Sequence, residues 1–270
     1  MDLSDRWRGR DGEENARSMP YARNGNVKIH YEVEGSGPAL LLHHWTFSSL
    51  DAWYELGYVD AFAPSHRLLL MDSRGHGTSD APHERAAYAP EPRVKDVVAV
   101  LDAAHVDRAA FFGFSMGGWM GFACAKYAPD RFSAYVLGGQ HPYAQSMAGA
   151  REWLRIGERD GAPAFVALWE REVGPLRAAE RKRMMRYDFT AMIAAARDRE
   201  SLEDVLADIR VPCLFFAGER DTVHAQAAQA AAAIRKSQFV TIPGVAHGET
   251  MARVDLVAPL VQDFLRSAHV

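Results

Sequence analysis

Residues 113–117 read GFSMG, and the residues around this pentapeptide indicate the fold. A short apolar run, Ala109–Phe112, precedes it, and a stretch with helical character, Trp119–Tyr127, follows it. A strand, a sharp turn and a helix form the setting in which a serine side chain is presented as a nucleophile. The flanking glycines leave room for a strained turn that larger side chains would obstruct. The pentapeptide alone is a weak signal, but this setting predicts that Ser115 is a nucleophile.

Further strands are predicted on both sides of this turn. Residues 27–33 alternate between apolar and polar side chains, as a half-exposed strand does. Short apolar runs, typical of strands buried on both faces, lie at 39–42, 66–71, 135–137, 211–216 and 239–242. Helical spacing of apolar residues appears at 93–105 and 254–265. Strands that alternate with helices predict an α/β fold, with a mostly parallel central sheet and helices on both faces.

One long stretch, residues 143–208, breaks this alternation. Its apolar residues follow helical spacing and include no convincing strand. We therefore expect a helical lid at 143–208, inserted into a core formed by 19–142 and 209–270. Residues 1–18 are charged and polar, which predicts a mobile N-terminal leader.

Composition narrows the class of protein. The 270 residues are 48% hydrophobic and carry a net charge of −4, so global disorder is excluded and neither nucleic acid nor an acidic membrane is favoured as a partner. No apolar run approaches the roughly 20 residues of a membrane span, and the N-terminus lacks a secretory apolar segment. Cys124 and Cys213 lie in apolar stretches, which predicts buried, reduced thiols. We expect a cytoplasmic monomer or homodimer that acts on a small molecule.

A serine hydroxyl needs a general base to become a nucleophile. His247 lies in a glycine-flanked loop after the last predicted strand, and Asp221 follows the strand at 211–216. Because loops after parallel strands meet at one edge of a sheet, we expect His247 to serve as base and Asp221 to orient it. The order serine, aspartate, histidine is the one that this architecture requires. Glu219 is the alternative acid.

Five motifs together resemble the α/β-hydrolase family, in its lid-bearing group of esterases, lactonases, carbon–carbon bond hydrolases and cofactor-free haloperoxidases. They are LLLH at 40–43, DSRGHGTSD at 72–80, GFSMG at 113–117, GERD at 218–221 and the loop around His247. They occur in the expected order and cover nearly the whole chain. An aspartate in place of Ser115 would have indicated dehalogenase or epoxide-hydrolase chemistry.

The resemblance implies further site residues. The backbone N–H groups of Met116 and Trp45 would form an oxyanion hole. Relatives usually have His-Gly before the second of these donors, whereas this chain has His43-His44, and His44 is therefore a candidate for a substrate contact. His141 and Tyr143 leave a predicted strand at the active edge and are candidates to line the pocket. His43, Asp72 and His76 are expected to hold loops in place.

The predicted reaction is acyl transfer to water, in which Ser115 attacks a carboxylic ester or a lactone of a small to medium, partly hydrophobic substrate. No metal and no organic cofactor are implied. Three alternatives stay open: hydrolysis of a carbon–carbon bond, a non-hydrolytic step such as a cyclisation with the same three residues, and a non-catalytic receptor that binds a small ligand in the same pocket.

Overall fold

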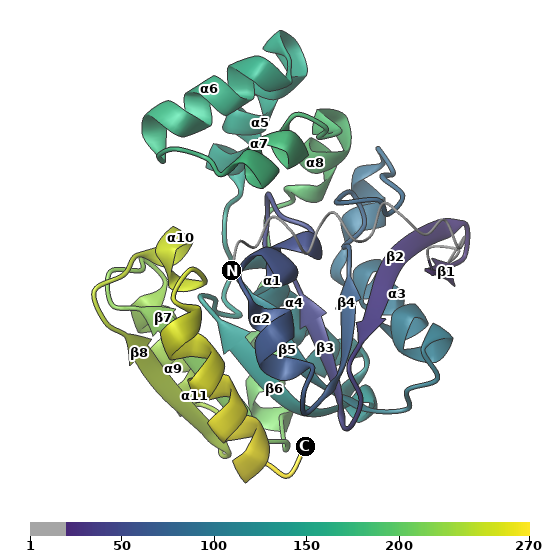
Figure 1. Cartoon of the computed structure of the whole chain (residues 1–270), viewed down its shortest axis with the longest axis vertical. Coiled ribbons are helices and arrows are strands. Elements are labelled where there is room, and N and C mark those ends of the chain that lie inside the picture. The colour runs from purple at the N-terminus through teal and green to yellow at the C-terminus, as the bar shows by residue number, and fades with distance from the viewer. Residues whose placement is uncertain (1–19) are drawn as a thin grey trace.

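A computed structural model describes residues 20–270, so the leader predicted at 1–18 lies outside the described residues. The described strands form one sheet in the order β1-β2-β4-β3-β5-β6-β7-β8 (Figure 1). β2 runs antiparallel to both of its neighbours, β1 and β4. From β4 onward in this order, each strand runs parallel to the next. The strands are β1 (Tyr21–Asn24), β2 (Val27–Glu34), β3 (Ala39–His43), β4 (Arg67–Met71), β5 (Ala109–Phe114), β6 (Phe132–Gly138), β7 (Cys213–Gly218) and β8 (Ser237–Ile242).

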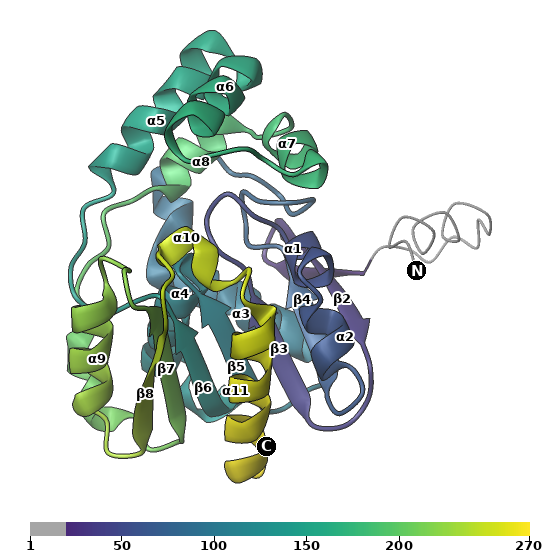
Figure 2. The same ribbon diagram turned by 60° about the vertical axis from the view of Figure 1, so that its left-hand side comes forward.

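Helices cover both faces of this sheet, which confirms the predicted α/β architecture (Figure 2). One face carries α3, α4 and α9, and the other carries α1, α2 and α11. The helices of these two layers are α1 (Asp51–Glu55), α2 (Tyr58–Phe62), α3 (Pro90–Ala103), α4 (Met116–Tyr127), α9 (His224–Ala232) and α11 (Val254–Ser267). The short elements are α10 (His247–Thr250), η1 (Arg85–Tyr88), η2 (Pro129–Arg131) and η3 (Glu203–Asp208). No helix within residues 20–270 is both long and apolar enough to cross a bilayer.

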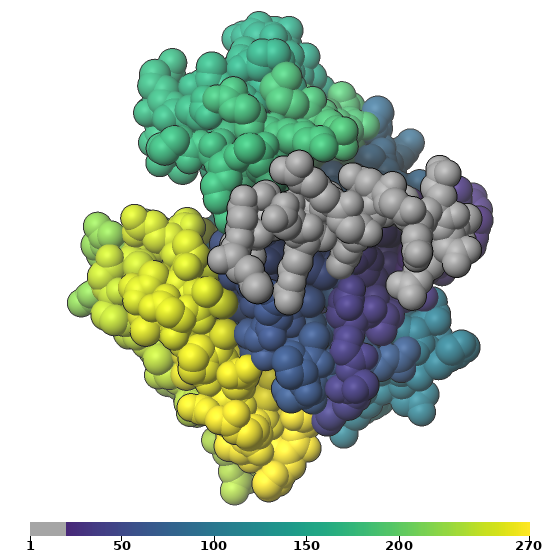
Figure 3. Space-filling model, viewed as in Figure 1, coloured from purple at the N-terminus to yellow at the C-terminus, as the bar shows by residue number. Residues whose placement is uncertain are grey.

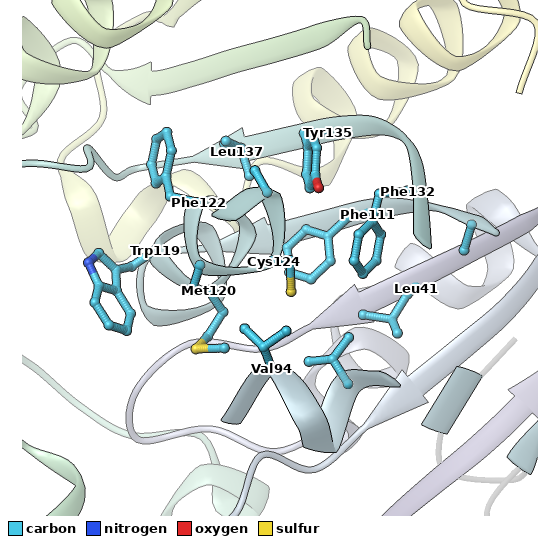
Figure 4. Packing of buried hydrophobic residues seen from close by; sticks show 14 of the residues in the cluster. Leu41, Val94, Phe111, Trp119, Met120, Phe122, Cys124, Phe132, Tyr135 and Leu137 are labelled. Carbon is cyan, nitrogen blue, oxygen red and sulfur yellow. The ribbon is translucent and has the colours of Figure 1, made fainter. Parts of the chain in front are cut away.

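The core around α4 fixes the position of the turn at Ser115. Every residue of β5 is buried, and side chains such as Phe111 and Phe122 fill the space between the sheet and α4 (Figure 4). α4 lies so close to the sheet that a Cβ atom on Gly121 would come within 2.3 Å of Leu137. Cys124, a free thiol, is buried in the same layer. The helix that begins after Ser115 is therefore held firmly against the strands.

Four helices lie between β6 and β7 in the sequence and stand apart from the two layers, beyond the carboxyl edge of the sheet (Figures 1 and 3). Their apolar side chains form a separate cluster, which includes Leu154, Phe165 and Met192. Residues 139–212, all of them described, contain no strand besides an isolated bridge between Gln145 and Arg199. The helices are α5 (Ala148–Asp160), α6 (Ala162–Glu172), α7 (Ala178–Met184) and α8 (Phe189–Ala195).

Candidate active site

Three side chains that are distant in the sequence meet at the carboxyl edge of the sheet. Ser115 directly follows β5, Asp221 follows β7, and His247 begins α10 after β8. His247 Nε2 lies 2.9 Å from Ser115 Oγ, and His247 Nδ1 lies 2.7 Å from Asp221 Oδ2. The structure thus brings together the three residues that the sequence predicts as nucleophile, base and acid.

The carboxylate of Asp221 determines which nitrogen of His247 carries the proton. The Asp221 side chain is fully buried and also accepts the Val223 N–H at 3.1 Å. A carboxylate only accepts hydrogen bonds, so Nδ1 of His247 donates to it and Nε2 presents its lone pair to the Ser115 hydroxyl. Glu219, the alternative acid, is exposed and accepts the Gly244 N–H at 2.8 Å instead. The arrangement can therefore remove a proton from Ser115.

The turn at Ser115 is strained. Its φ of 52° and ψ of −111° lie in a region that side chains other than glycine rarely adopt. Glycine is required on both sides, because a Cβ on Gly113 would lie 2.3 Å from the Gly117 backbone, and a Cβ on Gly117 would lie 2.1 Å from the His43 carbonyl oxygen. Strained serine geometry of this kind, held by close backbone packing, is typical of a nucleophile elbow.

Two backbone N–H groups beside the elbow are free to bind an anion. Within the described chain, neither Trp45 nor Met116 donates its N–H to an acceptor. Met116 is the first residue of α4, where the helix dipole favours negative charge. The close packing of Gly117 against His43 brings the loop that carries Trp45 to the elbow. Both residues keep their predicted place as candidate oxyanion donors.

The burial of His44 argues against its predicted contact with the substrate. Its ring is completely buried, and both nitrogens are bound to the backbone: Nδ1 donates to the Trp45 carbonyl at 2.8 Å, and Nε2 accepts the Ser73 N–H at 3.0 Å. Where relatives have a glycine, this chain therefore has a side chain that ties the Trp45 loop to the loop after β4. His44 holds the backbone in place, because none of its polar atoms remains to face a ligand.

His141 and Tyr143 stay predictions as substrate contacts. Their rings lie 5.5 Å apart on the segment after β6. His141 is buried, which is the main reason that its pKa is lowered, and its Nδ1 atom has no hydrogen-bond partner. Neither residue lines the pocket beside the elbow.

This pocket is bordered by the residues that follow the elbow and the Trp45 loop. Its cavity volume is about 30 Å³, which is room for a small chemical group only, and it is partly open to solvent. Sequence reasoning missed most of its polar residues. Arg93 offered the one signal, because it shares the predicted helical stripe of Val97 and Val100, where a cation is out of place. The pocket is lined by Thr46, His76, Tyr88, Pro90, Arg93, Met116, Trp119, Met147, Met192 and residues 195–200.

Three neighbouring histidines, His43, His44 and His76, are buried and neutral, and His76 also lines this pocket. Burial is the main cause that lowers the pKa of His43 to about 3 and that of His76 to about 4, and burial also lowers the pKa of His44 well below 6.5. The Nε2 atom of His44 accepts a backbone hydrogen bond, which its protonation would abolish. The folded chain therefore resists protonation at sites that the unfolded chain protonates readily.

We expect the free energy of unfolding to fall as the pH drops below about 6.5. A lowered folded-state pKa contributes stability that is complete above the unfolded value and is lost towards the folded value, at up to about 1.4 kcal/mol per histidine and pH unit. His30 acts in the opposite direction: burial lowers its pKa, but the hydrogen bond and charge of Asp72, with the charges of Glu32 and Asp51, together raise it above the ordinary value. Thermal unfolding between pH 7.5 and 5 checks this, with His44→Gln as a variant whose melting temperature depends less on pH. A melting temperature unchanged over this range would contradict the prediction.

Comparison with known proteins agrees with this geometry. A family model described as "alpha/beta hydrolase fold" matches residues 38–160. A putative 2-succinyl-6-hydroxy-2,4-cyclohexadiene-1-carboxylate synthase of Bacillus subtilis is 26% identical, over 88% of this chain and 96% of that protein. A pimeloyl-[acyl-carrier protein] methyl ester esterase of Xanthomonas campestris is 28% identical, over 88% and 98%. The crystal structure of an enol-lactonase from Burkholderia xenovorans superimposes with a TM-score of 0.79 at 27% identity, over 92% of this chain and 100% of that one.

Proposed function

Since the chain belongs to the α/β-hydrolase fold family, we propose that it is a serine hydrolase that cleaves a carboxylic ester or a lactone through an acyl-enzyme intermediate. One observation carries this proposal: the Ser115 hydroxyl, in a strained turn, shares a hydrogen bond with an imidazole that a buried carboxylate orients. That arrangement is the one that activates a serine for acyl transfer.

In the proposed mechanism, His247 takes the proton of Ser115 as its oxygen attacks the carbonyl carbon of the substrate. The N–H groups of Met116 and Trp45 hold the negative oxygen that forms, and each such donor typically accelerates the reaction by about 10²–10³-fold. His247 then gives the proton to the leaving oxygen. Water attacks the acyl group, His247 removes its proton, and the Ser115 oxygen leaves as a hydroxyl again. Asp221 stabilises the imidazolium in both halves.

The relatives support an oxygen ester as substrate. The Xanthomonas protein is named a methyl ester esterase and the Burkholderia structure an enol-lactonase, and both are similar to this chain over nearly its whole length.

We propose residues 143–208 as a lid over a core formed by 19–142 and 209–270. Phe47, on the loop of the proposed oxyanion donor Trp45, packs against this segment. Its ring centre lies 5.7 Å from that of Phe165 and 5.1 Å from that of Trp169. Phe47 also has a φ of 63°, which is unusual for an aromatic residue. Phe47 therefore connects the loop of Trp45 to the proposed lid through direct ring contacts.

A second candidate is a non-hydrolytic reaction by the same residues. It is favoured by the Bacillus relative, which is named a putative synthase and aligns over 96% of its own length. In such an enzyme, His247 would act as a base on the substrate while Ser115 forms no lasting acyl intermediate.

A fluorophosphonate probe together with an ester assay tests the proposal. We expect the probe to label the protein at a one-to-one ratio, on the peptide that carries Ser115, and to abolish hydrolysis of p-nitrophenyl acetate in proportion. Labelling without ester turnover would favour the second candidate. If the probe did not label the protein and no ester were hydrolysed, the results would favour a non-catalytic receptor.

A further inference from the structure

Three arginines of the described chain line the pocket beside the elbow without a carboxylate partner, and two of them, Arg93 and Arg199, are the more deeply buried; the third, Arg197, donates to the Arg85 carbonyl. Arg93 of α3 is only 7% exposed, makes one hydrogen bond, from Nη2 to Ser73 Oγ at 3.3 Å, and leaves its Nε unpartnered. Arg199 donates from Nη1 to Gln145 Oε1 at 2.8 Å. Its guanidinium carbon lies 5.7 Å from the centre of the Trp119 ring. In the described chain, no aspartate or glutamate comes within 4.0 Å of either arginine.

The acidic residues near these arginines are engaged elsewhere or lie in solvent. Asp96 binds Arg74 through both carboxylate oxygens. Asp198, on the pocket wall, binds Arg151 at 2.9 Å. Glu200 also borders the pocket but is exposed. Neither Arg93 nor Arg199 therefore has an ion-pair partner within the described chain, and Asp96 acts on Arg93 only through its charge.

The charge of Arg93 disfavours the cationic form of Arg199. Burial is the first cause that lowers the pKa of Arg199 to about 9, and the charge of Arg93 is the second. The pKa of Arg93 is lowered to about 10, also by burial first. A buried, uncompensated cation is costly to a fold unless an anion accompanies it.

Neutral hydrogen-bond donors surround the same space. Trp119 Nε1 and Tyr88 Oη are buried atoms without a partner, on residues that line the pocket. Indole N–H is only a donor, and a phenol donates readily to an anion. The apolar part of the wall includes Met116, Met192 and Ala196, and Thr46, His76, Asp198 and Glu200 add polar side chains to it. Donors and cations beside these apolar residues favour a small anion of single charge, since a higher charge costs more to remove from water.

We propose that Arg93 and Arg199 form a subsite for a carboxylate of the substrate, so that the preferred ester or lactone is an anion. The planar guanidinium fork matches the two oxygens of a carboxylate. Met116 borders the pocket and directly follows Ser115, which is itself not a lining residue. We expect the carboxylate and the scissile carbonyl to belong to one short molecule, such as a monoester of a four- or five-carbon diacid. This inference rests on the proposed ester or lactone hydrolysis.

Paired substrates test it. The probes are mono-p-nitrophenyl glutarate, which is anionic, and p-nitrophenyl pentanoate, which is neutral and of similar length, with spontaneous hydrolysis subtracted. We expect wild-type protein to prefer the anionic ester by at least about 10-fold in kcat/KM. Arg199→Gln should lose roughly 10–100-fold on the anionic ester, mostly through KM, and less than about threefold on the neutral one. Arg199→Lys should retain part of the preference.

Two further variants test the second arginine of the subsite and supply a control. Arg93 is buried in α3 and its loss endangers folding, so Arg93→Lys, which keeps the charge but not the fork, is used in place of a neutral residue; we expect it to lower the anionic preference. Arg171→Gln, at an exposed site on α6 where Arg171 pairs with Glu172, is the matched control and should change neither rate.

A binding measurement separates the subsite from the proposed reaction. Glutarate titrated into Ser115→Ala protein in a calorimeter needs no turnover, and we expect saturable one-to-one binding that Arg199→Gln weakens at least about 10-fold. Such binding without any ester turnover would retain the subsite and count against the hydrolysis. Ester turnover with equal kcat/KM on the two substrates, and no glutarate binding, would overturn the subsite and retain the hydrolysis.

Discussion

Replacing Ser115 with alanine is expected to lower kcat for p-nitrophenyl acetate by roughly 10⁴–10⁶-fold. In the proposed mechanism the hydroxyl oxygen bonds to the carbonyl carbon, and within the described chain no other side chain takes its place beside His247 Nε2. Steady-state kinetics of purified wild-type and variant protein measure the effect. The loss should appear in kcat, since the donors of the proposed oxyanion hole and the pocket remain to bind the ester.

Ser36→Ala is the matched control for this variant. Ser36 is exposed in the turn between β2 and β3, at the opposite edge of the sheet from Ser115. Its replacement should leave kcat within about twofold of wild type. Circular dichroism of both variants checks that the fold is intact. If Ser115→Ala protein kept a tenth or more of the wild-type kcat, Ser115 would not be the nucleophile.

Replacing Asp221 with asparagine is expected to lower kcat by roughly 10³–10⁴-fold. The carboxylate accepts the Nδ1 proton of His247 at 2.7 Å and so keeps the Nε2 lone pair towards Ser115. An amide can turn its NH₂ group towards Nδ1, which leaves the proton on the wrong nitrogen, and it carries no charge to stabilise the imidazolium. Because the side chain has nearly the same shape, the fold should survive.

Glu219→Gln distinguishes the two candidate acids. Glu219 is exposed and accepts the Gly244 N–H, a role that an amide oxygen can take over. We expect this variant to keep kcat within about threefold of wild type. A loss on Glu219→Gln that matched or exceeded the loss on Asp221→Asn would transfer the role of the acid to Glu219.

Most of the sheet could be predicted from the sequence, because strands buried on both faces leave a local pattern. β3, β4, β5 and β7 are all nearly wholly apolar and bounded by polar residues or glycine. The short strand β1 was not predicted. It lies at the sheet edge with only Ala22 buried, so its sequence carries no such pattern.

The candidate triad could be predicted for the same reason. Each of its members directly follows a predicted parallel strand, and the direction of a strand decides on which edge its loop falls. His44 could not be interpreted in this way. The resemblance to the family implies a glycine at this position, which is all that the sequence indicates about it. Only the folded chain shows that the two ring nitrogens of His44 bind the backbone of Trp45 and Ser73.

The sequence by itself therefore determined the layers of the fold, the edge at which the site lies, and the serine, aspartate and histidine that meet there. These features depend on apolar periodicity within short segments and on the order of the motifs along the chain, both of which can be read from the sequence. Only the folded chain shows which side chains line the pocket beside the candidate nucleophile. Arg93 and Arg199 are 106 positions apart, on a core helix and on the inserted segment, and their proximity follows from packing between these elements, which leaves no trace in either local sequence.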